Sequence, residues 1–529
     1  MRIVIALAGT FVMATLQPGA LTSTGHGQDS LTERASVSSA GTEAGAPSIQ
    51  AAISADARYV VFASDAPDLV ANDSGNMDVF VRDRQTGVTE RVSVASDGTP
   101  AGAPSLFPAI SGDGRYAVFQ SAATNLVTPD SNATDIFLRD RMAGTTTRVS
   151  VATDGTPGNG SSETPSISAG GRFVTFTSLA DNLVPDDGNQ DRDVFVRDLV
   201  AGTTELVSQA SDGTHGNFGS GGLGAGPARI SADGRYVVYG SFANNLVPGD
   251  LNGDDDIFVR DRMNSTTERV SVATDETERD GHSMYGSISD DGRYVAFFSE
   301  AALTVDDADG YSDVFLRDRT LGTTTRLSVG PGGTPPDGSS RFPVINADGG
   351  VIAFHSGATM LVSGDLNQTT DVFLYHLAGG FIDRASVADD GTEGNGASAS
   401  ASVNSDGSAV AFQSGAWNLV PNDGNDVADI FVRGKPAGPE ATSTPTPPPP
   451  TVTPTPTSGS CQPRMGDVND DGSVNSLDAL FILQFVANLV SSLPNLGHAD
   501  VNQDGDITPV DALLLLQYQA GIILCLPPP

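Results

Sequence analysis

The chain has 529 residues, of which 65 are Asp or Glu and 28 are Lys or Arg, so its formal charge is −37. A chain of this length has room for two to four domains. The excess of negative charge argues against binding to nucleic acid or to anionic membranes, which are negatively charged themselves. It suits a soluble protein in a calcium-containing medium outside the cell.

The N-terminal residues are typical of a secretory signal. Arg2 precedes an apolar run from Ile3 to Leu16, and small residues surround Gly19 and Ala20. This run is shorter than the about 20 apolar residues that a transmembrane helix needs. We therefore expect residues 1–28 to be a signal peptide, cleaved near residues 20–28, and the protein to be secreted.

Residues 31–436 form a repeat array. An anchor motif similar to ISADGR recurs every 57 to 63 residues, at Ile53, Ile110, Ile167, Ile230, Ile288, Ile345 and Val403. Each anchor leads into an alternating strand such as RYVVFAS, then a polar loop, a DVFVRDR segment, a Gly-Thr turn and a strand such as TERVSVA. With the short segment before the anchor, each unit has four predicted strands and no helix. Four-stranded units at this period are typical of a β-propeller.

The repeat scheme SADGRYVVF, DVFV and RVSV resembles the TolB-like, PD40 class of WD40-like repeats. The seventh unit ends at Phe431–Lys435 without its own RVSV strand, and an unpaired copy, ERASVSS, lies at Glu33–Ser39. We expect this N-terminal strand to complete the last blade, because closure of the ring removes exposed sheet edges. The predicted fold is mainly β, with a seven-bladed β-propeller over residues 29–436.

Successive turns of an antiparallel blade alternate between its two ends, so the longer, acidic loops should share one face, where binding residues concentrate. Three of these loops carry a D-x-N-x3-D pattern, which suits either calcium or Asx-turns that order the loop, and we favour the turns. The pattern occurs at Asp250, Asn252 and Asp256, at Asp365, Asn367 and Asp371, and at Asp423, Asn425 and Asp429.

Catalytic motifs are absent from the propeller sequence, and no catalytic residue is predicted. In GHSMYG (281–286), Tyr285 stands where a hydrolase elbow around Ser283 needs glycine, so we interpret the segment as a loop. GSGGLG (219–224) lacks a following helix and is an insertion rather than a nucleotide site. The recurring RDR segments should pair across strands on exposed blade edges.

Trp417 is the only tryptophan of the chain. At the equivalent positions of other repeats stand Thr124, Asp181 and Asn244. Trp417 is therefore a candidate ligand contact, although single exposed aromatic residues are often incidental.

Residues 437–460 are rich in proline and threonine and predict an extended linker. Beyond it, the twelve-residue segments DVNDDGSVNSLD (467–478) and DVNQDGDITPVD (500–511) place oxygen side chains at positions 1, 3, 5 and 12 and glycine at position 6. This spacing folds a loop around one hard cation, and oxygen-only ligands favour calcium. The predicted ligands, with position 7 acting through its carbonyl, are Asp467, Asn469, Asp471, Ser473 and Asp478, and Asp500, Asn502, Asp504, Asp506 and Asp511.

Each calcium loop is followed by one apolar segment, SLDALFILQFVANLV or PVDALLLLQYQAGII, that predicts a helix. A duplicated loop followed by one helix, with Asp at position 12, resembles the dockerin family over residues 461–529. The resemblance implies a small α-helical, EF-hand-like domain, two calcium ions and a cohesin partner. It places cohesin contacts near Ser476, Leu477, Pro509 and Val510, where the family's small hydroxyl pair is absent. The alternative is a stabilising calcium module without a cohesin partner.

The only two cysteines, Cys461 and Cys525, bracket this module. A disulfide between them would join the ends of the module and would require an oxidising compartment. This prediction agrees with the secretory signal.

Two functions fit these features. The first is a secreted, non-catalytic binding or display protein that engages a ligand through the propeller and docks to a cohesin-type partner or surface scaffold. The alternative is a propeller enzyme acting on polysaccharide, a glycoside hydrolase or lyase carried by a dockerin. Glycosidases need two carboxylates at a set distance beside a cleft. Because most acidic residues here recur in every repeat, they indicate structural roles.

Overall fold

The computed structural model describes residues 31–434, except 72, 74, 130–132 and 186, together with Val468, Ala479, Ile482 and Ala499. The chain divides into two compact units, residues 1–441 and 442–529, and each is described by itself. Among the described residues, no helix is both long and apolar enough to cross a bilayer.

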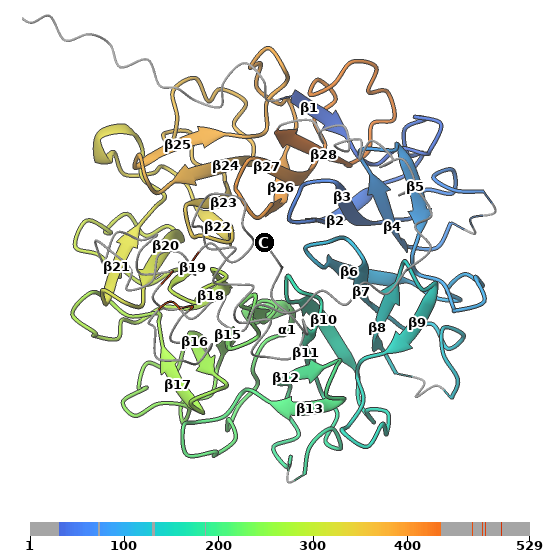
Figure 1. The fold of residues 1–529 in the computed structure, drawn as a ribbon. Coiled ribbons are helices and arrows are strands. Elements are labelled where there is room, and N and C mark those ends of the chain that lie inside the picture. The colour runs from blue at the N-terminus through green and yellow to red at the C-terminus, as the bar shows by residue number, and fades with distance from the viewer. Residues whose placement is uncertain are drawn as a thin grey trace, which may run out of the picture. The chain divides into compact units, whose positions relative to one another are not determined.

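The first unit is a ring of seven four-stranded antiparallel sheets (Figure 1), which confirms the predicted propeller. We call the space about the ring axis, which the inner strands surround and which holds a cavity, the channel. Blade 1 consists of β2 (Ser48–Ile53), β3 (Tyr59–Ser64), β4 (Asp78–Asp83) and β5 (Val88–Arg91). Blade 2 consists of β6 (Ser105–Ile110), β7 (Tyr116–Ser121), β8 (Asp135–Asp140) and β9 (Thr145–Arg148). Blade 3 consists of β10 (Ser162–Ile167), β11 (Phe173–Ser178), β12 (Asp193–Asp198) and β13 (Thr203–Leu206). Blades 4 and 5 consist of β14 (Arg229–Ile230), β15 (Tyr236–Ser241), β16 (Asp256–Asp261) and β17 (Thr266–Arg269); and β18 (Ser283–Ile288), β19 (Tyr294–Ser299), β20 (Asp313–Asp318) and β21 (Thr323–Arg326). Blades 6 and 7 consist of β22 (Ser340–Ile345), β23 (Val351–Ser356), β24 (Asp371–His376) and β25 (Phe381–Arg384); and β26 (Ser398–Val403), β27 (Ala409–Ser414), β28 (Asp429–Gly434) and β1 (Leu31–Arg34). Two single-turn helices, α1 (Gly222–Ala225) and η1 (Pro331–Gly333), lie in loops.

The hydrophobic core lies largely between blades. Val61 and Val79 of blade 1, for example, belong to the same buried cluster as Phe119 and Phe137 of blade 2. Within every blade, two aromatic rings on the second and third strands lie with their centroids 5.7–6.0 Å apart, as Phe119 and Phe137 do. Each blade therefore buries its apolar surface against its neighbours, and a single blade has no complete core of its own.

The ring closes as predicted, because β1 pairs antiparallel with β28 at the outer edge of blade 7 (Figure 1). The strand is shorter than the predicted 33–39 segment and ends at Arg34. After it, the Ser36 hydroxyl donates to the Asp429 carboxylate and accepts the backbone N–H of Ile430. In the other blades the RVSV segments likewise begin at the end of the fourth strand and continue as an irregular connection.

A second set of contacts fastens the blades to one another. In six blades the backbone N–H at the start of the inner strand donates to the carbonyl of the residue before the repeated Asp of the preceding blade, at 2.7–2.8 Å, and in blade 4 Ser220, which precedes β14, makes the same bond to Arg192. All seven junctions have this bond, including Ser48 to Ala428, which joins blade 1 to blade 7. The last junction is thus bonded in the same way as the other six.

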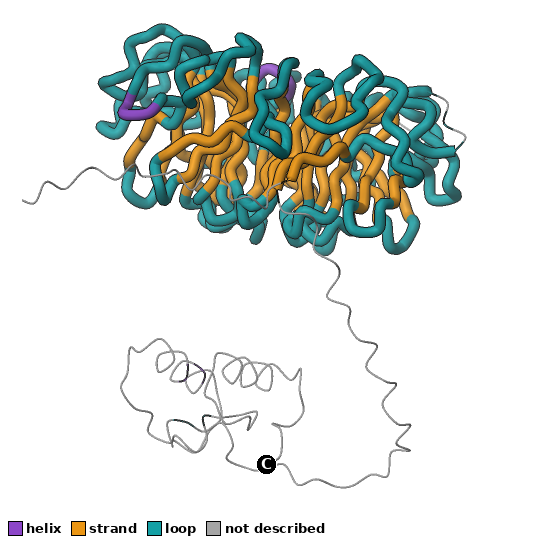
Figure 2. Tube along the Cα trace, turned by 90° about the horizontal axis from the view of Figure 1, so that it is seen from above, coloured by secondary structure: helices purple, strands orange, loops and turns teal. Residues whose placement is uncertain are grey.

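The longer loops share one face, as expected. Viewed edge-on, the strands form a middle layer with loops on both sides (Figure 2). The Asn125 amide in a second-to-third-strand loop donates to the Pro100 carbonyl in the loop that joins two blades, at 2.8 Å. The Asn182 amide makes the same contact with Pro157 at 2.9 Å. We call this side, which carries residues 65–77 and 92–104 and their equivalents, the loop face.

The prediction that the RDR segments are exposed is wrong, because their aspartates are buried and their arginines are buried or half-buried. In blade 4, Arg260 and Asp261 are only 5% and 7% exposed, and Arg260 donates to a carbonyl of the preceding blade at 3.1 Å. Asp261 accepts from Arg235 at 2.6 Å, which holds its pKa at about 2. Arg262 pairs with Glu205 of the preceding blade. The segment therefore binds the turn at Arg235 within its own blade and also binds the preceding blade.

Deletion of residues 29–40 removes β1 and leaves β28 with an unpaired edge. We expect this variant to melt several degrees lower than the wild type and to aggregate, measured by differential scanning calorimetry and light scattering. Deletion of residues 1–28 alone is the matched control and should leave the transition unchanged. An unaltered melting temperature after the longer deletion would refute the role of β1 in closure.

Candidate functional site

The acidic loops of blades 4, 5 and 6 gather three carboxylates each, at spacings that a metal ion would suit. In each group, however, an arginine from the fourth strand lies among the carboxylates. Arg326 is 2% exposed at its side chain and lies 2.5 Å from Asp313, and it also pairs with Asp309. The corresponding groups are Arg269 with Asp250, Asp256 and Glu278, and Arg384 with Asp365, Asp371 and Glu393. The guanidinium supplies the positive charge that these loops need.

The asparagines of the D-x-N pattern make Asx-turns, which confirms the favoured interpretation. The Asn252 side-chain oxygen accepts the backbone N–H of Asp254 at 3.0 Å, and Asn367 accepts that of Thr369 at 2.8 Å. Our sequence analysis missed a further copy of the pattern in blade 3, at 187–193. It also missed the contributions of the arginines and of Glu278 and Glu393, which come from other strands and loops.

Blade 3 lacks the arginine and has Leu206 at that position. Its repeated carboxylate, Asp193, accepts from the Ser208 hydroxyl at 2.6 Å and from the Asn189 amide at 2.8 Å. Burial raises the pKa of Asp193 to about 6. Asp313, which has its arginine, also has its pKa raised to about 6 by burial, so burial rather than the missing cation explains the shift at Asp193.

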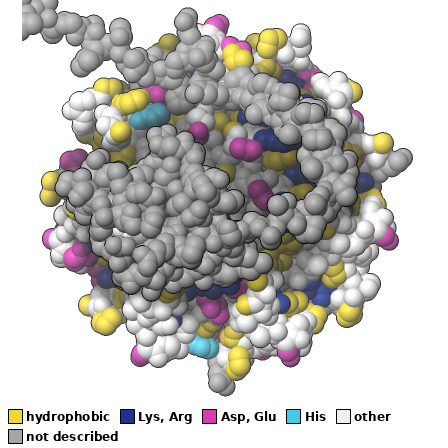
Figure 3. Space-filling model, in the orientation of Figure 1, with side chains coloured by type: hydrophobic (Ala, Val, Ile, Leu, Met, Phe, Trp, Pro, Cys, Tyr) yellow, Lys and Arg dark blue, Asp and Glu magenta, His cyan; other side chains and the backbone are white. Residues whose placement is uncertain are grey.

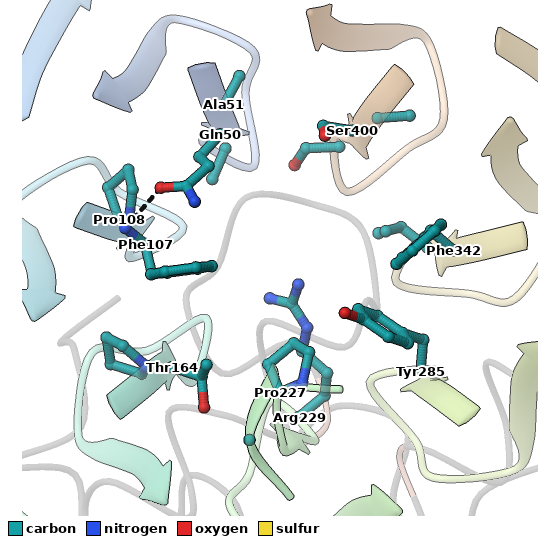
Figure 4. Close-up of a pocket in the computed structure, with 16 residues that line it drawn as sticks. Gln50, Ala51, Phe107, Pro108, Thr164, Pro227, Arg229, Tyr285, Phe342 and Ser400 are labelled. Carbon is teal, nitrogen blue, oxygen red and sulfur yellow. Dashed lines mark hydrogen bonds between the residues drawn. The ribbon is translucent and has the colours of Figure 1, made fainter. Parts of the chain in front are cut away.

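The channel is lined by the inner strands, and six of these have a β-bulge with a non-glycine residue in the left-handed region, at φ between +51° and +58°. Such conformations cost about 1–3 kcal/mol each and cluster at ligand sites. The six residues face the channel (Figure 4): Gln50, Phe107, Thr164, Tyr285, Phe342 and Ser400.

These residues help to enclose a cavity of about 210 Å³ in the channel. They stand three positions before the repeat anchor, where Pro227 completes the set, and side chains of very different chemistry occupy this position around the ring. The anchor itself, by contrast, is Ile in six repeats and Val in the seventh. Aligning the seven repeats column by column would have found this site from the sequence.

The insertion of blade 4 borders the same cavity. GSGGLG contains the single-turn helix α1, and Gly222 lines the cavity. Gly226 has φ +97°, and a Cβ there would lie 2.8 Å from the Cα of Tyr285 in the next inner strand. Gly240 is as constrained, since its Cβ would lie 2.7 Å from the Ala225 carbonyl oxygen. Glycines thus let the insertion pack tightly against the channel wall.

Among the described residues that line this cavity there is no carboxylate and no histidine, the side chains that most often act as general acids and bases in hydrolysis. The interpretation of 281–286 as a loop is wrong, because Ser283–Ile288 forms the inner strand β18. Ser283 is nevertheless no nucleophile. Its hydroxyl is buried and hydrogen-bonded to that of Ser299 at 2.8 Å, a pairing that recurs in other blades.

Trp417 lies in the loop between β27 and β28 and is 61% exposed. Its backbone N–H donates to the Asn395 side chain at 3.1 Å. It is not among the residues that line the channel cavity. A ligand at Trp417 would therefore bind on the loop face, and this contact stays a prediction.

Acidic side chains lie in separate groups around the visible part of the face shown in Figure 3. In the acidic loops described above, arginines offset much of the local negative charge. The net charge of −37 therefore does not by itself mark one binding surface on the propeller.

In the second unit, the predicted calcium ligands, the two cysteines and the predicted cohesin contacts lie outside the described residues. Ala479 and Ile482, just after the first predicted loop, are helical and buried, and Val468 and Ala499 are buried as well. These positions agree with a predicted helix that packs through its apolar side.

Residues 465–518 match the model of the dockerin type I domain. This domain type binds calcium and implies a cohesin partner, and the chain thus carries a dockerin type I domain after its propeller. No curated protein matches the chain.

Three solved structures are similar to the chain at low identity. TolB from Acinetobacter baumannii is 17% identical with a TM-score of 0.36, and the match covers 64% of this chain and 62% of TolB. An oligogalacturonate lyase from Vibrio parahaemolyticus is 11% identical with a TM-score of 0.44, over 77% of this chain and 91% of that one. The β-propeller domain of the Trilobed protease from Pyrococcus furiosus is 10% identical with a TM-score of 0.43, over 70% and 91%. At this distance the neighbours carry no argument about activity.

The substitution Arg326→Gln tests the role of the arginines. It leaves Asp307, Asp309 and Asp313 without their shared cation, so the free energy of unfolding of the propeller should fall by about 3–5 kcal/mol in urea denaturation. Arg279→Gln is the control, because Arg279 makes only an exposed pair with Asp275 at 3.7 Å, and it should change the value by less than about 1 kcal/mol. Equal effects of the two substitutions would contradict this role.

Proposed function

We propose that the protein is a secreted, non-catalytic binding or display protein. Its propeller engages a ligand, and its dockerin domain binds two calcium ions and docks to a cohesin-type partner or surface scaffold. The dockerin match at residues 465–518 is the observation that carries this proposal. The domain plan is a signal peptide at 1–28, the propeller at 29–436, a linker at 437–460 and the calcium module at 461–529.

Two calcium ions follow from the two twelve-residue loops, which offer the same oxygen pattern in register. Asp467 and Asp500 would supply the first ligand of each loop. Without metal, each loop brings several carboxylates together, and their repulsion opposes the compact state. Calcium binding and folding of the module should therefore be coupled.

Attachment to a partner would use the helical faces beside positions 10 and 11 of the loops, at Ser476, Leu477, Pro509 and Val510. Because two of these residues are apolar and one is proline, the matching cohesin surface should be less polar than one that recognises a hydroxyl pair. The secretory signal, the disulfide and calcium all suit the outside of a cell.

The alternative is an enzyme that acts on polysaccharide. Glycoside hydrolysis needs a pair of carboxylates beside the substrate. The cavity lining, as far as the structure describes it, includes no carboxylate, and the clustered aspartates of blades 4 to 6 are paired with arginines. These observations favour binding over hydrolysis at the channel.

An array of glycans and peptides, probed with the full-length protein, tests the ligand-binding part of the proposal. Retained ligands should be recovered unchanged after prolonged incubation, as judged by chromatography and mass spectrometry. Cleavage of any retained polysaccharide would favour the enzyme instead.

Calorimetric titration of the full-length protein should give two calcium ions per chain, with little response to magnesium, which needs tighter octahedral geometry. The double substitution Asp467→Ala and Asp500→Ala should abolish this binding and the calcium-dependent rise in melting temperature of the module. The melting transition of the propeller should be unchanged in the same variant. Residual stoichiometric calcium binding in the double variant would place calcium in the propeller loops and contradict the role given to their arginines.

Mass spectrometry of the secreted protein, digested without reduction, should find Cys461 linked to Cys525. The pair encloses the whole calcium module, and a closed loop of this size contributes up to about 4 kcal/mol in the chain-entropy model. Detection of both cysteines as free thiols would refute the disulfide and weaken the proposed compartment.

A further inference from the structure

Among the described residues that line the channel cavity, a single side chain is charged, that of Arg229 in β14 (Figure 4). At the equivalent position, directly before the anchor, the other inner strands have small or apolar residues. These are Ala52, Ala109, Ser166, Ser287, Val344 and Ser402. Arg229 is therefore a departure from the repeat and is not needed to build a blade.

Arg229 has no counter-ion among the described residues. Its guanidinium makes no ion pair or hydrogen bond there, whereas Arg269, Arg326 and Arg384 each contact several carboxylates. The Arg229 side chain lines the cavity and is half-buried, and burial lowers its pKa. An arginine in a protein still keeps its proton, so the channel holds an uncompensated positive charge.

Aromatic side chains lie around this charge. Phe107, Tyr285 and Phe342 line the cavity, and the rings of Tyr285 and Phe342 meet edge to face with centroids 4.2 Å apart. The Gln50 side-chain oxygen accepts the Phe107 backbone N–H at 2.8 Å, which orients the Gln50 amide at the channel wall. The hydroxyl-bearing residues Thr164, Ser400 and Ser402 complete a lining that is apolar with a few hydrogen-bonding groups.

The insertion of blade 4 provides a second observation. The same 63-residue repeat that carries Arg229 also carries α1, and Gly222 of α1 lines the cavity beside it. This insertion contacts the inner strands of both neighbouring blades, β10 and β18. The largest departure from the repeat length and the charged side chain of Arg229 therefore belong to the same local structure.

We propose that the channel binds a small organic carboxylate, held by Arg229 and packed against Phe107, Tyr285 and Phe342. A planar guanidinium matches a carboxylate through two parallel hydrogen bonds, and the rings match the faces of a sugar or an apolar side chain. The cavity of about 210 Å³ has room for one such group, since a water molecule takes about 30 Å³. An acidic sugar and the carboxyl end of a peptide share this chemistry. The inference rests on the proposed ligand binding by the propeller and names the ligand class.

The test uses the full-length protein and two matched pairs of probes. D-galacturonate is compared with D-galactose, and N-acetyl-L-phenylalanine with its amide, by calorimetry and by the shift of the propeller melting transition. At least one carboxylate should bind, and its neutral counterpart should bind at least about tenfold more weakly, because the charge-assisted hydrogen bonds are lost. The pair that responds identifies the source of the carboxylate.

Arg229→Ser restores the residue found in blades 3, 5 and 7 and should keep the melting transition of the propeller. It should weaken carboxylate binding at least about tenfold. Arg279→Ser removes the same charge from an exposed site and should leave binding unchanged. If Arg229→Ser does not fold, Arg229→Lys keeps the charge but loses the two parallel bonds, and it should also bind more weakly.

Equal binding of acid and neutral probes, no binding of any probe, or wild-type affinity in both Arg229 variants would overturn the inference. A ligand from the glycan and peptide array that binds Arg229→Ser as tightly as the wild type would do so as well, while supporting the proposed function. Calcium binding, measured on the same preparation, tests the dockerin part separately.

Discussion

The structure depends on the burial of apolar surface between neighbouring blades. A four-stranded blade has two faces, and side chains such as Val61, Val79, Phe119 and Phe137 form a core only when two blades meet. Every blade therefore needs a neighbour on each side, and an open row of blades would leave two apolar faces in water. Closing the ring is the one arrangement that satisfies all seven. This explains why the contacts at the last junction, from β1 to β28 and from Ser48 to Ala428, reproduce those within the array.

The same requirement shapes the electrostatics. The edge of a blade places polar groups in the junction with its neighbour. The charges of the RDR segments are paired there, as Asp261 is with Arg235. On the loop face, Arg326 pairs with three aspartates and occupies the position that a metal ion would take among them. Metal dependence is thus expected to be confined to the dockerin domain, where the loops have no basic residue. The propeller thus sets its own arginines against the negative charge of its loops, whereas the dockerin domain takes calcium ions from solution.

Most of the fold could be predicted from the sequence, because the signals are local and repeated. The alternation of RYVVFAS and the period of the anchors gave the blades, and the unpaired copy at Glu33–Ser39 gave the closure. Other features are set by contacts between distant residues. Arg326 and Asp313, or Arg262 and Glu205, meet only once the strands are paired and the blades are adjacent. The strand within GHSMYG was missed for a related reason. Its glycines and polar residues are typical of a loop, but the segment pairs as a strand whose bulge directs Tyr285 into the channel.

Repetition also separates structural from functional residues. In a repeat array, a residue that maintains the blade recurs at the same position, as the buried Phe pairs and the RDR segments do. A residue that contacts a ligand on the ring axis need not recur, because each blade contacts a different part of the ligand. The channel positions from Gln50 to Ser400 differ from blade to blade, although they share a strained backbone that the neighbouring strands must hold. In six blades the structure thus keeps a similar geometry at the channel wall and varies its chemistry. In blade 4, whose strand pairing has no such bulge, the unpaired charge of Arg229 is the most pronounced departure.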